Sequence, residues 1–312
     1  MKGNKATILS FAEKCKSILE SNWQGKLCTI KVDAKGSKGE IYSSKVKYIV
    51  KKGKPYIWVP EKDAHNMNTI IDERGSLSVT SPMTGALTQL LRSLEKPPSR
   101  IALLGEVAPL RNEKAKIVSE ALEGIISSER KAMKEANHLV SGIMSSSNMK
   151  ATTRSESLMG IINSNESYVV YKFSPSSYTY IDSNGGNHEV AVEDIATAEI
   201  DPLSHFSTSL IDGINNSEAR RKALILFCIT HQNTNAKDAF MLSVDYKGFN
   251  VLGKILGPMK HDGSRDYTWS EFRFTFDEQA HDLQTFCSRL VEMEEKALKK
   301  VTSFSGLGLK TE

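Results

Sequence analysis

The sequence predicts an α+β protein whose main part is a β-barrel. Three strand patterns follow one another between residues 26 and 59, which is typical of an antiparallel meander. Along the chain as a whole, short strands occur with intervening helices but without a regular strand-helix-strand alternation, which argues against a doubly wound parallel sheet. Residues 201–298 form a second unit of helix, strands and helix. We therefore expect a barrel followed by a smaller α+β domain.

The N-terminal part supplies one helix and the meander. Apolar residues recur every three or four positions over residues 7–22, which predicts an amphipathic helix. Alternating or short apolar runs then predict strands, separated by Gly36, Gly39 and the turn Lys52-Gly53-Lys54. These strands are residues 26–32, 40–50 and 55–59.

The middle of the chain mixes both types of element. We expect helices at 62–73, 85–94 and 112–136, and strands at 76–80, 100–110, 168–173 and 178–181. Residues 141–165 are rich in Ser, Met and Asn without a sustained period, which indicates a long loop or insertion. Within it, Ser145–Ser147, Lys150 and Arg154 are candidates for contact with a partner or an anion, against the alternative of disorder.

The C-terminal unit has clear boundaries. We expect a helix at 210–231, two strands within 238–252 joined at Lys247-Gly248, a strand at 269–276 and a helix at 277–299. Phe272, Phe274 and Phe276 share one face of the 269–276 strand. The predicted domains are therefore 1–200, a barrel with the insertion at about 141–165, and 201–302, an α+β domain with a tail at 303–312.

Composition excludes several classes of protein. The chain has 312 residues and a net charge of +4, and its basic residues are scattered except at 45–54 and 297–301, so we expect no nucleic-acid partner. The four cysteines have neither zinc-ligand nor disulfide-framework spacing, which favours an intracellular, reducing compartment. The longest apolar runs are too short to span a bilayer, so we expect no membrane association.

Five motifs carry a resemblance to a known superfamily. They are Gly25-Lys-Leu-Cys-Thr29, Lys62-Asp-Ala-His-Asn66, Gly75-Ser-Leu-Ser-Val-Thr-Ser-Pro82, Ser99-Arg-Ile-Ala-Leu-Leu-Gly-Glu-Val107 and Tyr168-Val-Val-Tyr-Lys-Phe173. Their order resembles the FMN-binding split barrel of the pyridoxamine 5'-phosphate oxidase superfamily. The unit at 201–298 resembles the small domain of HugZ-type haem-degrading proteins and of the plant glutamyl-tRNA reductase-binding protein.

The resemblance implies a homodimer whose ligand site, for FMN or for haem, lies between two subunits. In flavin-using members the segment that matches residues 65–68 lies near the FMN phosphate, which makes His65 and Asn66 candidates. In haem-binding members an arginine lies close to the iron-bound ligand, which makes Arg92 and Arg100 candidates. A histidine after the last barrel strand ligates the iron, a role that falls to His205.

The sequence departs from the superfamily pattern at two places. Asp212-Gly-Ile-Asn-Asn-Ser-Glu218 stands where a His-Met-Asn motif is common, and Lys26 and Cys28 replace small hydroxyl residues. Catalytic residues are therefore not assigned, and three functions stay open. They are haem or tetrapyrrole binding, with haem degradation or regulation of tetrapyrrole metabolism; an FMN-dependent oxidoreductase; and a cofactor-free module for a protein partner. By the same resemblance we expect a plant protein of the chloroplast stroma.

For each candidate a plainer role competes with ligand binding. His65 is alternatively a surface or helix-capping histidine, and His205 is alternatively a solvated histidine in a loop. Arg92 is alternatively an ordinary surface arginine.

Overall fold

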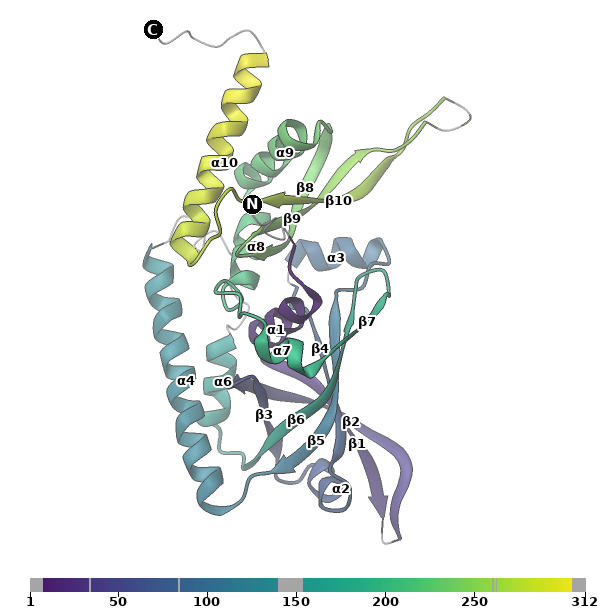
Figure 1. The fold of residues 1–312 in the computed structure, drawn as a ribbon, viewed down its shortest axis with the longest axis vertical. Helices are drawn as coiled ribbons and strands as arrows, with labels where there is room; N and C mark the ends of the chain where they lie inside the picture. Colours follow the sequence, from purple (N-terminus) through teal and green to yellow (C-terminus); the bar gives the residue numbers. More distant parts are fainter. Residues whose placement is uncertain are drawn as a thin grey trace.

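The computed structural model describes residues 8–33, 35–83, 85–139, 154–259, 261 and 263–304. Figure 1 shows two β-sheets one above the other along the long axis, with helix α4 beside the larger one. The elements are α1 (Phe11–Ser21), β1 (Gln24–Asp33), β2 (Gly36–Lys51), β3 (Lys54–Pro60), α2 (His65–Ile71), β4 (Arg74–Thr80), α3 (Gly85–Ser93), β5 (Arg100–Pro109), α4 (Asn112–Leu139), α6 (Arg154–Ile162), β6 (Tyr168–Ile181), β7 (Asn187–Val190), α7 (Val192–Thr197), α8 (Ser207–Asn215), α9 (Glu218–Gln232), β8 (Ala236–Asp245), β9 (Gly248–Leu256), β10 (Tyr267–Thr275) and α10 (Leu283–Phe304).

The larger sheet closes into an antiparallel barrel. Its strand order is β3-β2-β1-β4-β5-β6-β7, and an additional pairing of β3 with β6 closes the ring. Alternation explains why these segments are strands: in β1, Leu27 and Thr29 are buried while Lys26 is exposed. The hairpin between β2 and β3 turns at Lys52 and Gly53, whose positive φ angles of 51° and 72° suit a two-residue turn.

Helices fill one end of the barrel and cover its outside. The apolar face of α1 packs Cys15, Ile18 and Leu19 into the barrel core. Ser10 and Glu13 form a capping box that fixes where α1 begins. On the outer surface, α4 and α6 bury Leu122 and Leu158 against the barrel strands.

The smaller sheet has the order β10-β9-β8, and it packs on α8, α9 and α10. Helix α3 also contacts it, because Leu87 and Leu91 are buried against Phe240 and Leu252. The α+β class with a barrel followed by a smaller sheet is thus confirmed, whereas the division into domains at residue 200 stays a prediction. Within the described part of the chain, every helix is too short or too polar to cross a bilayer.

A polar contact joins the two sheets through α1. Glu13 accepts hydrogen bonds from the Tyr246 hydroxyl at 2.8 Å and from the Lys247 ammonium at 3.1 Å. These contacts hold the β8–β9 turn against the start of α1. Burial raises the pKa of Glu13, but the hydrogen bond from the Ser10 backbone N–H, together with those from Tyr246 and Lys247, lowers it overall.

Three predicted segments differ from the structure in their helices. The segment 141–165 contains helix α6 from Arg154 onward, while residues 141–153 lie outside the described residues. The helix expected at 210–231 is broken into α8 and α9, because the Asn215 side chain bonds both backbone groups of Met241 at 2.9 and 2.7 Å. The last helix begins at Leu283 rather than 277, since Asp282 accepts the Thr285 amide at 2.7 Å and caps it.

The two strands expected at 168–173 and 178–181 form one strand, β6. A register shift beside Gly105 accommodates Pro175, which has no N–H for the sheet. A Cβ at Gly105 would lie 2.2 Å from the Ser174 carbonyl oxygen, so glycine allows this close approach. Strand β7 and helix α7 follow β6, and the sequence patterns predict neither of them.

Candidate functional site

His65 lies in a hydrogen-bonded network inside the barrel wall. Its side chain is fully buried, and its ring nitrogens lie 2.8 Å from the Thr29 hydroxyl and 3.0 Å from the Ser44 hydroxyl. Burial lowers its pKa, so the ring is neutral near neutral pH. His65 therefore ties α2 to β1 and β2.

Asn66, the second residue predicted to bind flavin phosphate, is also occupied. Its amide nitrogen donates to the carbonyls of Pro60, Glu61 and Asp63 at 2.8, 2.9 and 3.0 Å. Its oxygen accepts the Tyr171 hydroxyl at 2.7 Å. These contacts use the donors of the Asn66 side chain within the protein, so they position α2 rather than present donors to a phosphate.

His205, the predicted iron ligand, lies in the loop before α8 beside a buried ion pair. Arg154 donates from Nη1 to His205 Nδ1 at 2.7 Å and to the Glu129 carboxylate at 3.0 Å. The Arg154 side chain is only 8% exposed and that of Glu129 20%, so the pair is shielded from solvent. Burial, aided by the charge of Arg154, lowers the pKa of His205 to about 4.

The contact with Arg154 fixes the tautomer of His205. A guanidinium only donates hydrogen bonds, so Nδ1 must carry the lone pair and Nε2 the hydrogen. A backbone hydrogen bond to Glu20 engages the ring as well. A histidine that ligates iron through Nε2 needs its hydrogen on Nδ1, where Arg154 would then oppose it. Iron ligation through Nε2 of His205 stays a prediction and requires Arg154 to release the ring.

The two predicted arginines lie apart from both clusters. Arg92 is exposed in the last turn of α3, and Arg100 begins β5, where it pairs with Ile181 and Thr80. No contact among the described residues joins either arginine to His65 or His205. The structure therefore brings His65 and Asn66 together but does not assemble the five candidates into one site.

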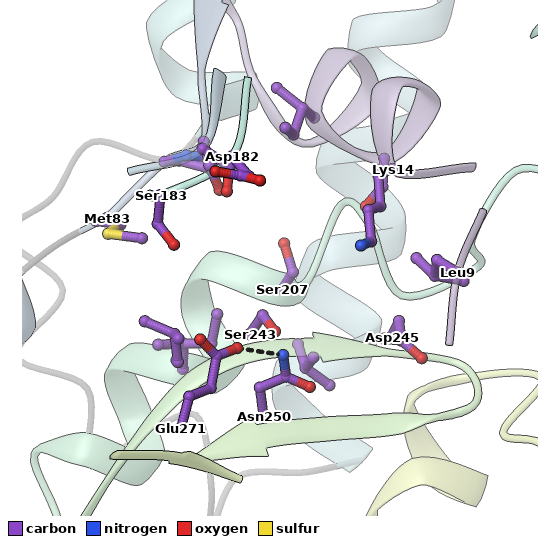
Figure 2. Close-up of a pocket in the computed structure, with 18 of the residues that line it drawn as sticks. Leu9, Lys14, Met83, Asp182, Ser183, Ser207, Ser243, Asp245, Asn250 and Glu271 are labelled. Carbon is purple, nitrogen blue, oxygen red and sulfur yellow. Dashed lines mark hydrogen bonds between the residues drawn. The ribbon is translucent and has the colours of Figure 1, made fainter. Parts of the chain in front are cut away.

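A cleft between the two sheets was missed by the sequence reasoning. Its volume is about 320 Å³, and Figure 2 shows Lys14 facing Asn250 and Glu271 across it. Leu91 and Ser99, the neighbours of Arg92 and Arg100, line it, but none of the five candidates does. Its residues come from α1, the 81–83 and 96–99 loops, the β6–β7 turn, α8 and all strands of the smaller sheet. No local motif signals a cleft of this kind.

The residues that the structure describes contain no cluster of three or more His, Cys, Asp or Glu side chains suited to a metal ion.

Arg154, which the sequence analysis placed in a loop, instead begins helix α6 and forms the buried ion pair with Glu129.

Comparison with solved structures identifies the architecture. The heme-binding protein from Mycobacterium smegmatis is 16% identical and superposes with a TM-score of 0.55, over 94% of this chain and 99% of that one. The fold is a split β-barrel. The predicted split-barrel fold is thereby confirmed, and the superposition covers residues of the C-terminal unit as well.

Two further solved structures superpose with lower TM-scores. ChuZ from Campylobacter jejuni is 11% identical, with a TM-score of 0.39 over 61% of this chain and 63% of its own. A putative pyridoxamine 5'-phosphate oxidase from Listeria innocua is 11% identical, with a TM-score of 0.33 over 56% of this chain and 100% of its own. No family model and no curated protein matches the sequence.

Proposed function

We propose that this split-barrel protein is a homodimer that binds a haem-type tetrapyrrole without degrading it. The observation that carries the proposal is the full-length match to a heme-binding protein, which spans the barrel and the C-terminal unit together. A binding role rather than a catalytic one is supported by His65 and His205, whose ring nitrogens are held by neighbouring groups. Regulation of tetrapyrrole metabolism through a protein partner, in the chloroplast stroma, stays a prediction.

The surface of α2 supports burial against a second subunit or a flat ligand. Met67, Ile70 and Ile71 are 64%, 60% and 58% exposed, although all three are large and apolar. Exposed apolar side chains on one short helix favour contact with another surface. The resemblance implies a ligand site between subunits in this same region, so one face would serve dimer and ligand.

An FMN-dependent oxidoreductase is the alternative, and its support is weaker. The flavin phosphate was expected beside His65 and Asn66, whose side chains are engaged within the barrel wall. Helix α2 is also only 7 residues long, and the His65 backbone N–H at its start already donates to the Asp63 carboxylate at 2.9 Å.

Absorbance spectroscopy separates these functions. Titration of the purified protein with haem is expected to give a saturable Soret shift, whereas FMN at the same concentrations is expected to give no change in flavin absorbance or fluorescence. A yellow preparation that retains flavin would overturn the proposal in favour of the oxidoreductase. A protein that responds to neither ligand would be an interaction module.

The dimer gives a separate prediction. Ile70→Lys is expected to convert a dimer into a monomer, because a lysine ammonium in an apolar interface must lose its hydration. Sedimentation velocity measures the change. Ile117→Lys is the matched control, since Ile117 is an isoleucine of similar exposure, 61%, on a different helix, α4. If Ile70→Lys sediments as the same dimer as the wild type, α2 is not the interface.

A further inference from the structure

The cleft between the two sheets carries an inference that goes beyond tetrapyrrole binding. It has a volume of about 320 Å³, which lies within the range of small-molecule sites. Figure 2 shows α1 on one side and the β8–β10 sheet on the other, with Lys14, Ser243, Asn250 and Glu271 directed toward the space between them.

Lys14 presents an ammonium group to this cleft. The rings of Phe11 and Tyr180 lie 5.2 and 5.5 Å from its Nζ, and burial lowers its pKa. Among the residues that the structure describes, no carboxylate forms an ion pair with it. A cation that has lost part of its hydration and has no ion-pair partner among the described residues is a favourable place for the anionic group of a ligand.

The opposite side of the cleft offers one acid that is not neutralised. Arg273 cancels the charge of Asp245 through two hydrogen bonds of 2.7 and 2.8 Å, and it also donates to Asn250 at 3.1 Å. Asn250 in turn donates to Glu271 at 2.6 Å. Glu271 thus accepts a hydrogen bond from a neutral amide, forms no ion pair among the described residues, and is held at the cleft by Asn250.

The remaining charges favour a ligand without net charge. Lys14, Lys96 and Arg273 line the cleft together with Asp182, Asp245 and Glu271, three cations against three anions. Asp182 is already satisfied by His188 at 3.1 Å and by the backbone of Asn184 and Gly186. A polyanionic ligand would be repelled by the carboxylates, and a ligand with only a positive charge would be repelled by Lys14. A ligand with one group of each sign meets both requirements.

We propose that this cleft binds a small zwitterion of the amino-carboxylate class, with its carboxylate on Lys14 and its ammonium on Glu271. The serine hydroxyls of the lining, among them Ser243, supply further polar contacts. The site is separate from the α2 face, so it does not depend on the proposed tetrapyrrole function.

Ligand titration of the full chain tests the proposal. Glycine, β-alanine, γ-aminobutyrate and δ-aminovalerate serve as probes of increasing length, and butyrate and butylamine as matched ligands of single charge. Saturation-transfer NMR and calorimetry measure binding. At least one zwitterion is expected to bind saturably and at least about tenfold more tightly than either single-charge ligand, since each charge-assisted hydrogen bond contributes about that factor.

Two variants assign the ends of the ligand. Lys14→Met is expected to weaken zwitterion binding about tenfold or more, and Glu271→Gln to remove the advantage over butyrate. Lys299→Met, exposed on α10, is the control that leaves binding unchanged. Thermal melts confirm that each variant is folded. Failure of every zwitterion to bind overturns the proposal, and so does binding that Lys14→Met leaves unchanged.

Discussion

Replacing Arg154 with methionine is expected to destabilise the protein by about 3–5 kcal/mol, because it leaves one member of a buried ion pair without its partner. Burial raises the pKa of the Glu129 carboxyl. The positive charge and the hydrogen bond of Arg154 act in the opposite direction. Without Arg154, Glu129 must become protonated or remain as an uncompensated charge. Urea denaturation at neutral pH measures the loss as a lower midpoint with an unchanged slope.

Helix α4, which carries Glu129, supplies the control for Arg154. Lys131 pairs with Glu135 at 3.8 Å, and both side chains are well exposed, at 80% and 65%. Lys131→Met is therefore expected to cost less than about 0.5 kcal/mol. The double variant Arg154→Met, Glu129→Gln should recover part of the loss, since it removes the unpaired acid. Equal effects of Arg154→Met and Lys131→Met would contradict the account of the buried pair.

The free energy of unfolding of the Asp201→Asn variant is expected to increase relative to that of the wild type as the pH rises. Asp201 is 2% exposed, and burial raises its pKa to about 7. Because the pKa of Asp201 is higher in the folded than in the unfolded state, the protonated carboxyl contributes its full stabilisation at pH values below the unfolded pKa. This contribution is lost as the pH rises through about 7. Between pH 5 and pH 8 the wild type should lose about 3 kcal/mol relative to Asp201→Asn.

Other groups titrate in the same range, so the comparison must be between variants. Burial also raises the pKa of Glu20 to about 7, which acts in the same direction as Asp201. The pKa of His205 is lowered to about 4, so its contribution is lost as the pH falls from the unfolded value through 4. Urea unfolding of both proteins at pH 5 and pH 8 isolates Asp201, with the exposed Glu123→Gln as control. A difference that does not change with pH would contradict the assignment.

Local patterns were sufficient to predict most elements of this fold. The alternation in β1 and the capping signals around Ser10 act within a few residues, so the sequence determines them directly. The break at Asn215 depends on Met241, which is 26 positions away. Likewise β6 continues through Pro175 only because Gly105 leaves room on the neighbouring strand. Contacts of this kind are decided by tertiary packing, which a window of sequence does not contain.

The candidate sites show the same limit more strongly. The sequence identifies His65 and His205 as residues able to bind a ligand, but it does not show which side chains lie beside them. The partner of His205 is Arg154, 51 positions earlier, in a segment that the sequence placed in a loop. Nothing in the sequence distinguishes Lys14 and Glu271 from other charged residues. Only the fold places the two on opposite sides of one cleft. What made these residues distinctive was burial and pairing, and both arise from the fold.

The most direct test of tetrapyrrole binding compares haem with iron-free protoporphyrin IX. Since Arg154 holds His205 in the tautomer opposite to the one that Nε2 ligation needs, binding should not depend on iron. We predict saturable binding of both molecules with affinities within about threefold of each other, unchanged in His205→Ala and in the exposed control His281→Ala. Absence of binding would contradict the proposed function. Tight binding of haem alone, lost in His205→Ala, would show that His205 leaves Arg154 and ligates the iron.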